Sequence, residues 1–160
     1  MIIRPYTHAD SDAVWCIIEP VLRAGETYAL PADWTQDEAL AYWLQPGHDV
    51  FIAEDEDQIL GTYYLHANQM GGGAHVANCA FMVDSHTTGR GVAGAMCAHA
   101  LRHAEALGFR AMQFNFVVST NTRAVALWLR HGFEIVGTLP AAFHHPTLGF
   151  VDTYVMYQTL

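Results

Sequence analysis

Lysine is absent from this chain of 160 residues, and all seven basic residues are arginine. With 16 acidic residues the formal net charge is −9, which argues against a nucleic-acid partner because phosphate binding needs a basic surface. No apolar run reaches the length of a membrane span, and the first residues turn polar too early for a secretory leader. We therefore expect a soluble, cytoplasmic protein with no membrane partner, which binds anions through arginine or backbone amides.

Cysteine is scarce as well. The three cysteines, Cys16, Cys79 and Cys97, lack the C-x-x-C spacing of redox and metal sites, so we expect reduced, buried, small hydrophobic residues. Among the ten histidines, His99 and His103 stand four apart but lack the glutamate of the zinc-protease motif. No metal site is predicted.

The order of apolar patterns and turn signals predicts a single domain over residues 1–160, an α/β protein with a mixed sheet and helices on its faces. We expect helices at about residues 11–24, 35–44, 91–107 and 121–131. We expect strands at residues 1–6, 49–55, 58–67, 75–84, 110–119, 133–139 and 150–160. A long loop containing Pro140 and Pro146 is expected between the last two strands.

The segment "GRGVAGAMC", residues 89–97, matches the pattern G-x-G-x-x-G. It does not fit a dinucleotide-binding turn, because the segment "DSHTT", residues 84–88, precedes Gly89 where a strand should lead directly into the turn, and the next strand carries no acid at its end. Gly89 and Gly91 allow positive φ, and the helix after them begins with free N–H groups that can bind phosphate. Arg90 adds a positive charge nearby. A glycine bend without a ligand is the alternative reading.

The stretch "FMVDSHTTGRGVAGAMCAHALRHAEALGF", followed by "NTRAVALWLRHGFEIVG", resembles the Gcn5-related N-acetyltransferase (GNAT) superfamily. The resemblance is close over residues 76–139 and looser over the whole order of elements. It implies a mostly antiparallel, twisted sheet with about four helices, in which the parallel strands at 75–84 and 110–119 splay apart. It also implies an N-acetyltransferase with acetyl-CoA as cosubstrate.

The resemblance assigns cofactor-binding residues by motif. The main chain of Phe81 and Val83 would contact pantetheine, and the Asn121 side chain would hydrogen-bond the same arm. The loop that would wrap the diphosphate of coenzyme A consists of Gly89, Arg90, Gly91, Val92, Ala93 and Gly94.

Two positions depart from the family pattern. Thr88 stands where the family usually has arginine or glutamine, which would weaken phosphate binding unless Arg90 compensates. Trp128 stands where the family usually has a tyrosine that acts as the acid toward the leaving thiolate. An indole N–H donates a hydrogen bond but does not titrate, so the proton source is unidentified.

Asn78 and Asn115 lie in the middle of strands that we expect to be neighbours, where asparagine is disfavoured. From the residues alone, these side-chain amides either form hydrogen bonds with backbone groups that an irregular sheet leaves unpaired, or serve as neutral donors to a substrate. The segments "HVANCAF" and "FNFVVSTNTRAVALW" are similar to fungal acetyltransferases of azetidine-2-carboxylate and related proline analogues, which also have tryptophan at the position of Trp128. That similarity implies that Asn78 and Asn115 hold the acceptor's carboxylate.

Direct transfer would require a base for the acceptor amine, and Glu26, His66 and His75 are the candidates. Backbone N–H groups near Phe81 to Val83 would stabilise the oxyanion. The residues Tyr28, Tyr63, Tyr64 and Phe143 either line the acceptor side or only pack.

Two alternatives to a small amino or imino acid acetyltransferase remain open. One is a non-catalytic sensor that binds acyl-CoA, and the other is an acetyltransferase for a protein N-terminus, a lysine or an antibiotic. The apolar closing strand could add to a partner's sheet and many family members are dimers, so we expect a homodimer.

Overall fold

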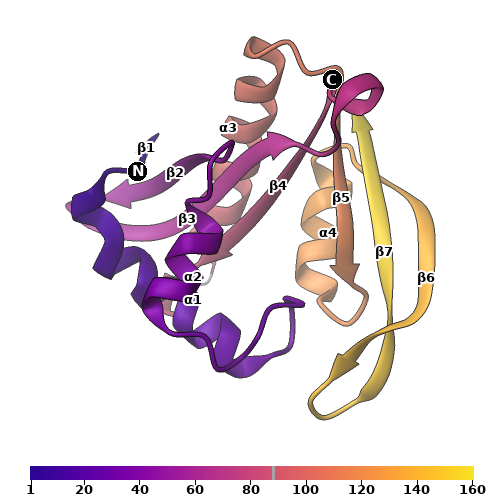
Figure 1. Cartoon of the computed structure of the whole chain (residues 1–160), viewed down its shortest axis with the longest axis horizontal. Helices are drawn as coiled ribbons and strands as arrows, with labels where there is room; N and C mark the ends of the chain where they lie inside the picture. The colour runs from indigo at the N-terminus through magenta and orange to yellow at the C-terminus, as the bar shows by residue number, and fades with distance from the viewer. Residues whose placement is uncertain (88) are drawn as a thin grey trace.

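A seven-stranded sheet with the strand order β1-β2-β3-β4-β5-β7-β6 carries the fold (Figure 1). The computed structural model describes residues 1–87 and 89–160. The strands are β1 (Ile2–Pro5), β2 (Asp49–Asp55), β3 (Gln58–Ala67), β4 (Val76–Val83), β5 (Ala111–Val118), β6 (Glu134–His145) and β7 (Gly149–Thr159). The α-helices are α1 (Ser11–Ala24), α2 (Gln36–Trp43), α3 (Val92–Ala106) and α4 (Thr122–Arg130). The mixed α/β sheet and its four α-helices confirm the predicted fold class.

Local sequence signals set the helix ends. Thr35 caps α2 through a capping box with Glu38, in which each residue accepts a backbone N–H of the other. Helix α1 ends at Gly25, whose φ of 62° is the left-handed conformation that glycine adopts without a Cβ clash. Helix α3 begins after Gly91, whose φ is 76°.

The helices cover both faces of the sheet, α1 and α2 on one and α3 and α4 on the other (Figure 1). Ile18 of α1 and Trp43 of α2 are almost fully buried in the first core cluster with Met82 of β4. Met96 of α3 and Trp128 of α4 belong to the second cluster on the opposite face. Side chains of β4 alternate between these layers because successive residues of a strand point to opposite faces.

The two central strands, β4 and β5, are parallel but pair only at their beginnings. Val76 pairs with Ala111 and Ala77 with Met112, after which no pair is formed between the two strands within the described residues. The strands diverge toward their C-terminal ends (Figure 1). A register shift between Phe114 and Val117 in the pairing of β5 with β7 accompanies this divergence. Backbone groups on the facing edges of β4 and β5 are therefore available to other partners.

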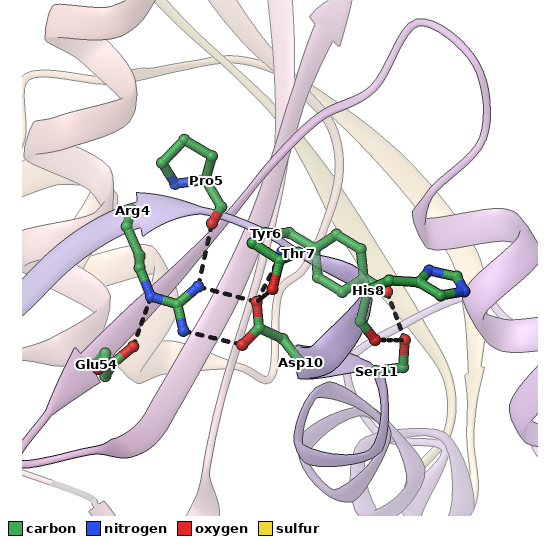
Figure 2. A network of polar contacts seen from close by, with 8 residues as sticks. All are labelled: Arg4, Pro5, Tyr6, Thr7, His8, Asp10, Ser11 and Glu54. Atoms are coloured by element: carbon green, nitrogen blue, oxygen red, sulfur yellow. Dashed lines mark hydrogen bonds and ion pairs between the residues drawn. The ribbon is translucent and has the colours of Figure 1, made fainter.

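An ion-pair network fixes the first strand to the first helix (Figure 2). The Arg4 guanidinium donates two hydrogen bonds of 2.9 Å to the Asp10 carboxylate and a third, of 2.6 Å, to Glu54. The Thr7 N–H also donates to Asp10. Asp10 is 6% exposed, and its ion pair with Arg4 lowers the pKa of the carboxyl group to about 2.

The expected loop around Pro140 and Pro146 is wrong in most of its extent. Strand β6 continues to His145, and only residues 146–148 form the turn to β7. Pro140 is tolerated because β6 is an edge strand, where a missing N–H leaves no neighbouring strand unpaired. Ala141, with a φ of 50°, lies in the irregularity between Leu139 and Phe143 that accommodates it.

The expectation that all three cysteines are buried is wrong for Cys16, which is exposed on α1. Cys79 and Cys97 are buried free thiols, and burial raises the pKa of Cys97 to about 12. None of the described helices combines the length and the apolar character needed to cross a bilayer.

Candidate functional site

Two cavities adjoin along the gap between β4 and β5. The first, which we name the glycine-loop cleft, has a volume of about 760 Å³ and lies between the end of β4, the loop before α3, and α4. The second, the inter-strand cavity, has a volume of about 280 Å³ and lies between the parted strands and residues 27–30. The residues that line both cavities are Thr27, Tyr28, Phe81, Asn121, Ala124 and Trp128.

The start of helix α3 forms one wall of the glycine-loop cleft. Gly89 and Gly91 adopt φ values of 87° and 76°, which turn the chain into the helix. The first helical hydrogen bond runs from the Ala95 N–H to the Gly91 carbonyl at 3.0 Å. The N–H groups of Val92, Ala93 and Gly94 precede it, so they have no acceptor inside the helix and line the cleft. Such a helix start binds anions through these amides and the helix dipole.

Arg90 does not lie among the residues that line the cleft. Its guanidinium donates a 2.6 Å hydrogen bond to Asp55, which also pairs with the N-terminal ammonium at 2.7 Å. The positive charges on the cleft wall belong to Arg123 and Arg130 of α4. Thr88, the other position discussed for this loop, lies outside the described residues.

Because β4 and β5 have parted, the N–H and the carbonyl of Phe81 both form hydrogen bonds with the Tyr28 side chain and not with a neighbouring strand. The Tyr28 hydroxyl donates to the Phe81 carbonyl at 2.6 Å and accepts from the Phe81 N–H at 3.0 Å. Tyr28 thereby occupies one of the amides that the sequence assigned to pantetheine and the oxyanion. Val83 lines the glycine-loop cleft farther along β4.

Asn121 and Trp128 join the two cavities from α4. The Asn121 Oδ1 accepts a 3.3 Å hydrogen bond from the Ala124 N–H and caps the helix, so its side-chain NH2 group is not used by the cap. Trp128 is 8% exposed, and its ring packs against those of Phe81 and Phe114 at centroid distances of 5.1 and 5.0 Å. The indole ring of Trp128 therefore forms an apolar part of the wall that the two cavities share.

Asn78 bridges the two strands just beyond their last pair. Its Nδ2 donates to the Gln113 carbonyl at 2.8 Å, and its Oδ1 lies 3.3 Å from His66 Nε2. Because an amide oxygen only accepts, His66 Nε2 is the donor of that contact. Asn78 thus gives the Gln113 carbonyl a hydrogen bond on the edge of β5 that β4 leaves unpaired, and it also lines the inter-strand cavity.

Asn115 lies across the same cavity on the irregular part of β5. Its Nδ2 donates to Asn68 Oδ1 at 2.7 Å, and its Oδ1 accepts from Gln113 Nε2 at 2.8 Å. Within the described residues, the second hydrogen of each Nδ2 of Asn78 and Asn115 has no protein acceptor. Both residues line the cavity, and among the residues that line it no side chain is charged.

Comparison with known proteins identifies the family. The sequence profile described as the acetyltransferase (GNAT) family matches residues 15–133. The chain belongs to the GNAT acetyltransferase family. It is an N-acetyltransferase, and its parted strands and glycine-rich helix start are the elements through which its sequence resembled the family.

This acetyltransferase is similar to several individual proteins. It shares 42% identity and a TM-score of 0.95 with a GCN5-related N-acetyltransferase from Kribbella flavida, over 99% of this chain and 97% of the other. It is 26% identical to the N-acetyltransferase aca1 of Schizosaccharomyces pombe, over 86% of this chain and 73% of that protein. A phosphinothricin acetyltransferase from Sinorhizobium meliloti, solved in complex with AcCoA, has a TM-score of 0.86 at 21% identity, over 99% of this chain and 88% of the other.

None of the three candidate bases, Glu26, His66 and His75, lines the glycine-loop cleft or the inter-strand cavity. Glu26 and His75 are exposed, and neither is among the residues that line the two cavities. His66 is half-buried and reaches the inter-strand cavity only through its contact with Asn78. Tyr28 and Tyr64 line that cavity.

Other predicted residues of the acetyltransferase lie elsewhere. The Tyr63 hydroxyl lies 2.6 Å from His99 Nδ1 on the α3 face, and Phe143 packs near Phe116 with ring centroids 6.2 Å apart. Among residues 1–87 and 89–160, no group of three or more His, Cys, Asp or Glu side chains is arranged to hold a metal ion.

Two residues of the site and one contact escaped sequence reasoning. Arg123 and Arg130 stand seven apart on α4, which puts them on one helical face, and this spacing was the available signal. The contact of Tyr28 with Phe81 joins residues 53 apart, and nothing in the local sequence indicates it.

Proposed function

We propose that this acetyltransferase moves the acetyl group of acetyl-CoA to the amine of a small amino or imino acid by direct attack on the thioester. The observation that carries the proposal is the shared wall between the glycine-loop cleft and the inter-strand cavity. Direct transfer requires that both substrates reach one point, and orientation within such a site supplies much of the rate acceleration.

The glycine-loop cleft supports the donor half of the proposal. The amides of Val92, Ala93 and Gly94 would hold the diphosphate, and Arg123 would add positive charge from α4. The side-chain NH2 of Asn121 and the backbone of Val83 would bind the pantetheine arm. An elongated thioester fits a cleft that runs from a phosphate-binding helix start to the gap between two strands.

The inter-strand cavity supports the acceptor half. A carboxylate accepts hydrogen bonds strongly, and the free N–H groups of Asn78 and Asn115 are donors in a wall without anionic side chains. The same wall has no carboxylate to stabilise an ammonium ion, which favours binding of the neutral amine. A cavity of about 280 Å³ also limits the acceptor to a small molecule.

The test compares acceptors that differ only in the carboxylate. Purified protein is incubated with acetyl-CoA and a panel of small amino and imino acids, each paired with its carboxamide, and products are identified by mass spectrometry. We expect acetylated acids and a preference for each acid over its carboxamide of about tenfold or more, the value of one charge-assisted hydrogen bond.

Asn115→Asp tests the same contact from the protein side. The new carboxylate repels the acceptor's carboxylate, so the preference for the acid should disappear, while Asn115→Ala should weaken it without reversing it. Exclusive acetylation of a peptide or an antibiotic would contradict the acceptor class. Binding of acetyl-CoA without thiol release for any amine would leave a non-catalytic sensor.

A further inference from the structure

The wall shared by the two cavities is the place where the leaving thiolate must be protonated, if the proposed function holds. The six residues that line both cavities offer few proton donors. Of these six, Tyr28 alone has a side chain that titrates, since the alcohol of Thr27 is far too weak an acid and the indole of Trp128 does not ionise. Tyr42, Tyr64 and Cys79 line only the inter-strand cavity.

The Tyr28 hydroxyl is held at that wall by two short contacts. It donates to the Phe81 carbonyl at 2.6 Å and accepts from the Phe81 N–H at 3.0 Å. These backbone groups face it because β4 has parted from β5. A thioester carbonyl that took the Phe81 N–H would therefore come within reach of the phenol.

The surroundings of Tyr28 keep its proton in place. Burial raises the pKa of the phenol well above its ordinary value, because desolvation disfavours the phenolate. Tyr42 on α2 and Cys79 on β4 are the titratable groups that face it, and burial also raises the pKa of Cys79. The hydroxyl is thus present as an acid throughout the physiological pH range.

We propose that Tyr28, on the loop between α1 and α2, is the general acid of the transfer, in place of the α4 side chain at position 128. The amine nitrogen attacks the thioester carbon and forms the C–N bond, and the C–S bond then breaks with its electron pair remaining on sulfur. The phenolic proton of Tyr28 passes to that sulfur, and the phenolate regains a proton from the acylated nitrogen. The products are the amide and free coenzyme A.

The first experiment removes the hydroxyl and keeps the ring. Tyr28→Phe should lower kcat by about 100-fold or more, the usual contribution of a positioned acid, with KM for both substrates within about threefold of wild type. Tyr6→Phe is the matched control, because the Tyr6 hydroxyl contacts Ser11 at 2.6 Å and lines neither cavity. Calorimetry with coenzyme A and thermal unfolding establish that each variant is folded.

The second experiment changes the acidity of the phenol without removing it. A fluorinated tyrosine at position 28 loses its proton at lower pH than tyrosine, so kcat of this variant should fall at an alkaline pH where the wild type is still fully active. A purely structural hydroxyl would give the variant and the wild type the same pH profile of kcat. This variant also decides the matter if Tyr28→Phe does not fold.

The outcomes separate this proposal from the proposed function. Wild-type protein that releases no thiol with any amine would contradict the function itself. If the wild-type protein is active, either of two results would overturn the role of Tyr28 and leave the proposed function standing. One is a kcat of Tyr28→Phe within about threefold of wild type, and the other is a fluorinated variant whose pH profile of kcat matches that of the wild type.

Discussion

Replacing Gly91 by alanine tests the phosphate-binding helix start. Gly91 has a φ of 76° directly before α3, and a Cβ at this position would meet no atom of residues 1–87 and 89–160 within 4 Å. The free protein therefore has room for the methyl group. Any loss of coenzyme A affinity in the variant then comes from the contact between the ligand and this turn, not from a clash inside the protein.

Two magnitudes follow from this geometry. Alanine in the left-handed region costs about 1–2 kcal/mol of folding free energy. A methyl group or a small backbone adjustment that removes one amide from the diphosphate costs about 1.5–3 kcal/mol of binding, or roughly 10- to 150-fold in Kd.

Gly108→Ala provides the matched control. Gly108 follows the other end of α3 and has a φ of 86°, and a Cβ built on it has no atom of the described residues within 4 Å. Chemical denaturation should show similar destabilisation of both variants, while calorimetric titration with coenzyme A should show weaker binding only for Gly91→Ala. Equal affinities for wild type and Gly91→Ala would refute the phosphate-binding role of this turn.

Two further predictions concern charge. Asp10→Asn should lower the free energy of unfolding by about 2 kcal/mol at pH 7, because Arg4 lowers the pKa of Asp10 from 3.8 to about 2 in the folded state. This stabilisation is complete above about pH 4 and disappears as the pH falls toward 2, so denaturation curves of the two proteins should converge there; a constant gap would contradict the ion-pair explanation. Arg123→Ala should weaken coenzyme A binding by about three- to tenfold in low salt. Arg90→Ala should weaken it by less, because Arg90 is paired with Asp55. Calorimetry at two salt concentrations can check both values, and a larger loss for Arg90→Ala than for Arg123→Ala would contradict this division of roles.

The sequence predicted the elements whose signals are local. The helix expected from residue 35 matches α2, which Thr35 caps, and the glycines at 89 and 91 marked the turn into α3. The region around Pro140 was misread because proline usually ends a strand, whereas an edge strand tolerates it. The exposure of Cys16 depends on the rotation of α1 against the sheet, which the residue type alone does not determine.

The sequence indicated which residues lie at the site, but not the hydrogen bonds and ion pairs that they form. The residues that the motif assigned to coenzyme A, apart from Arg90, all line one cleft, the glycine-loop cleft. The end of β2 places Asp55 beside Arg90, and the divergence of β4 from β5 gives Asn78 and Tyr28 backbone partners. These contacts are long-range, so neither motif spacing nor periodicity contains them.

Amide hydrogen exchange read by NMR would show whether the start of α3 binds the diphosphate. Saturating coenzyme A should slow exchange at Val92, Ala93 and Gly94, because the diphosphate becomes the acceptor for amides that have none inside the helix. If coenzyme A binds the protein and exchange at these three amides stays unchanged, the diphosphate does not bind at this helix start.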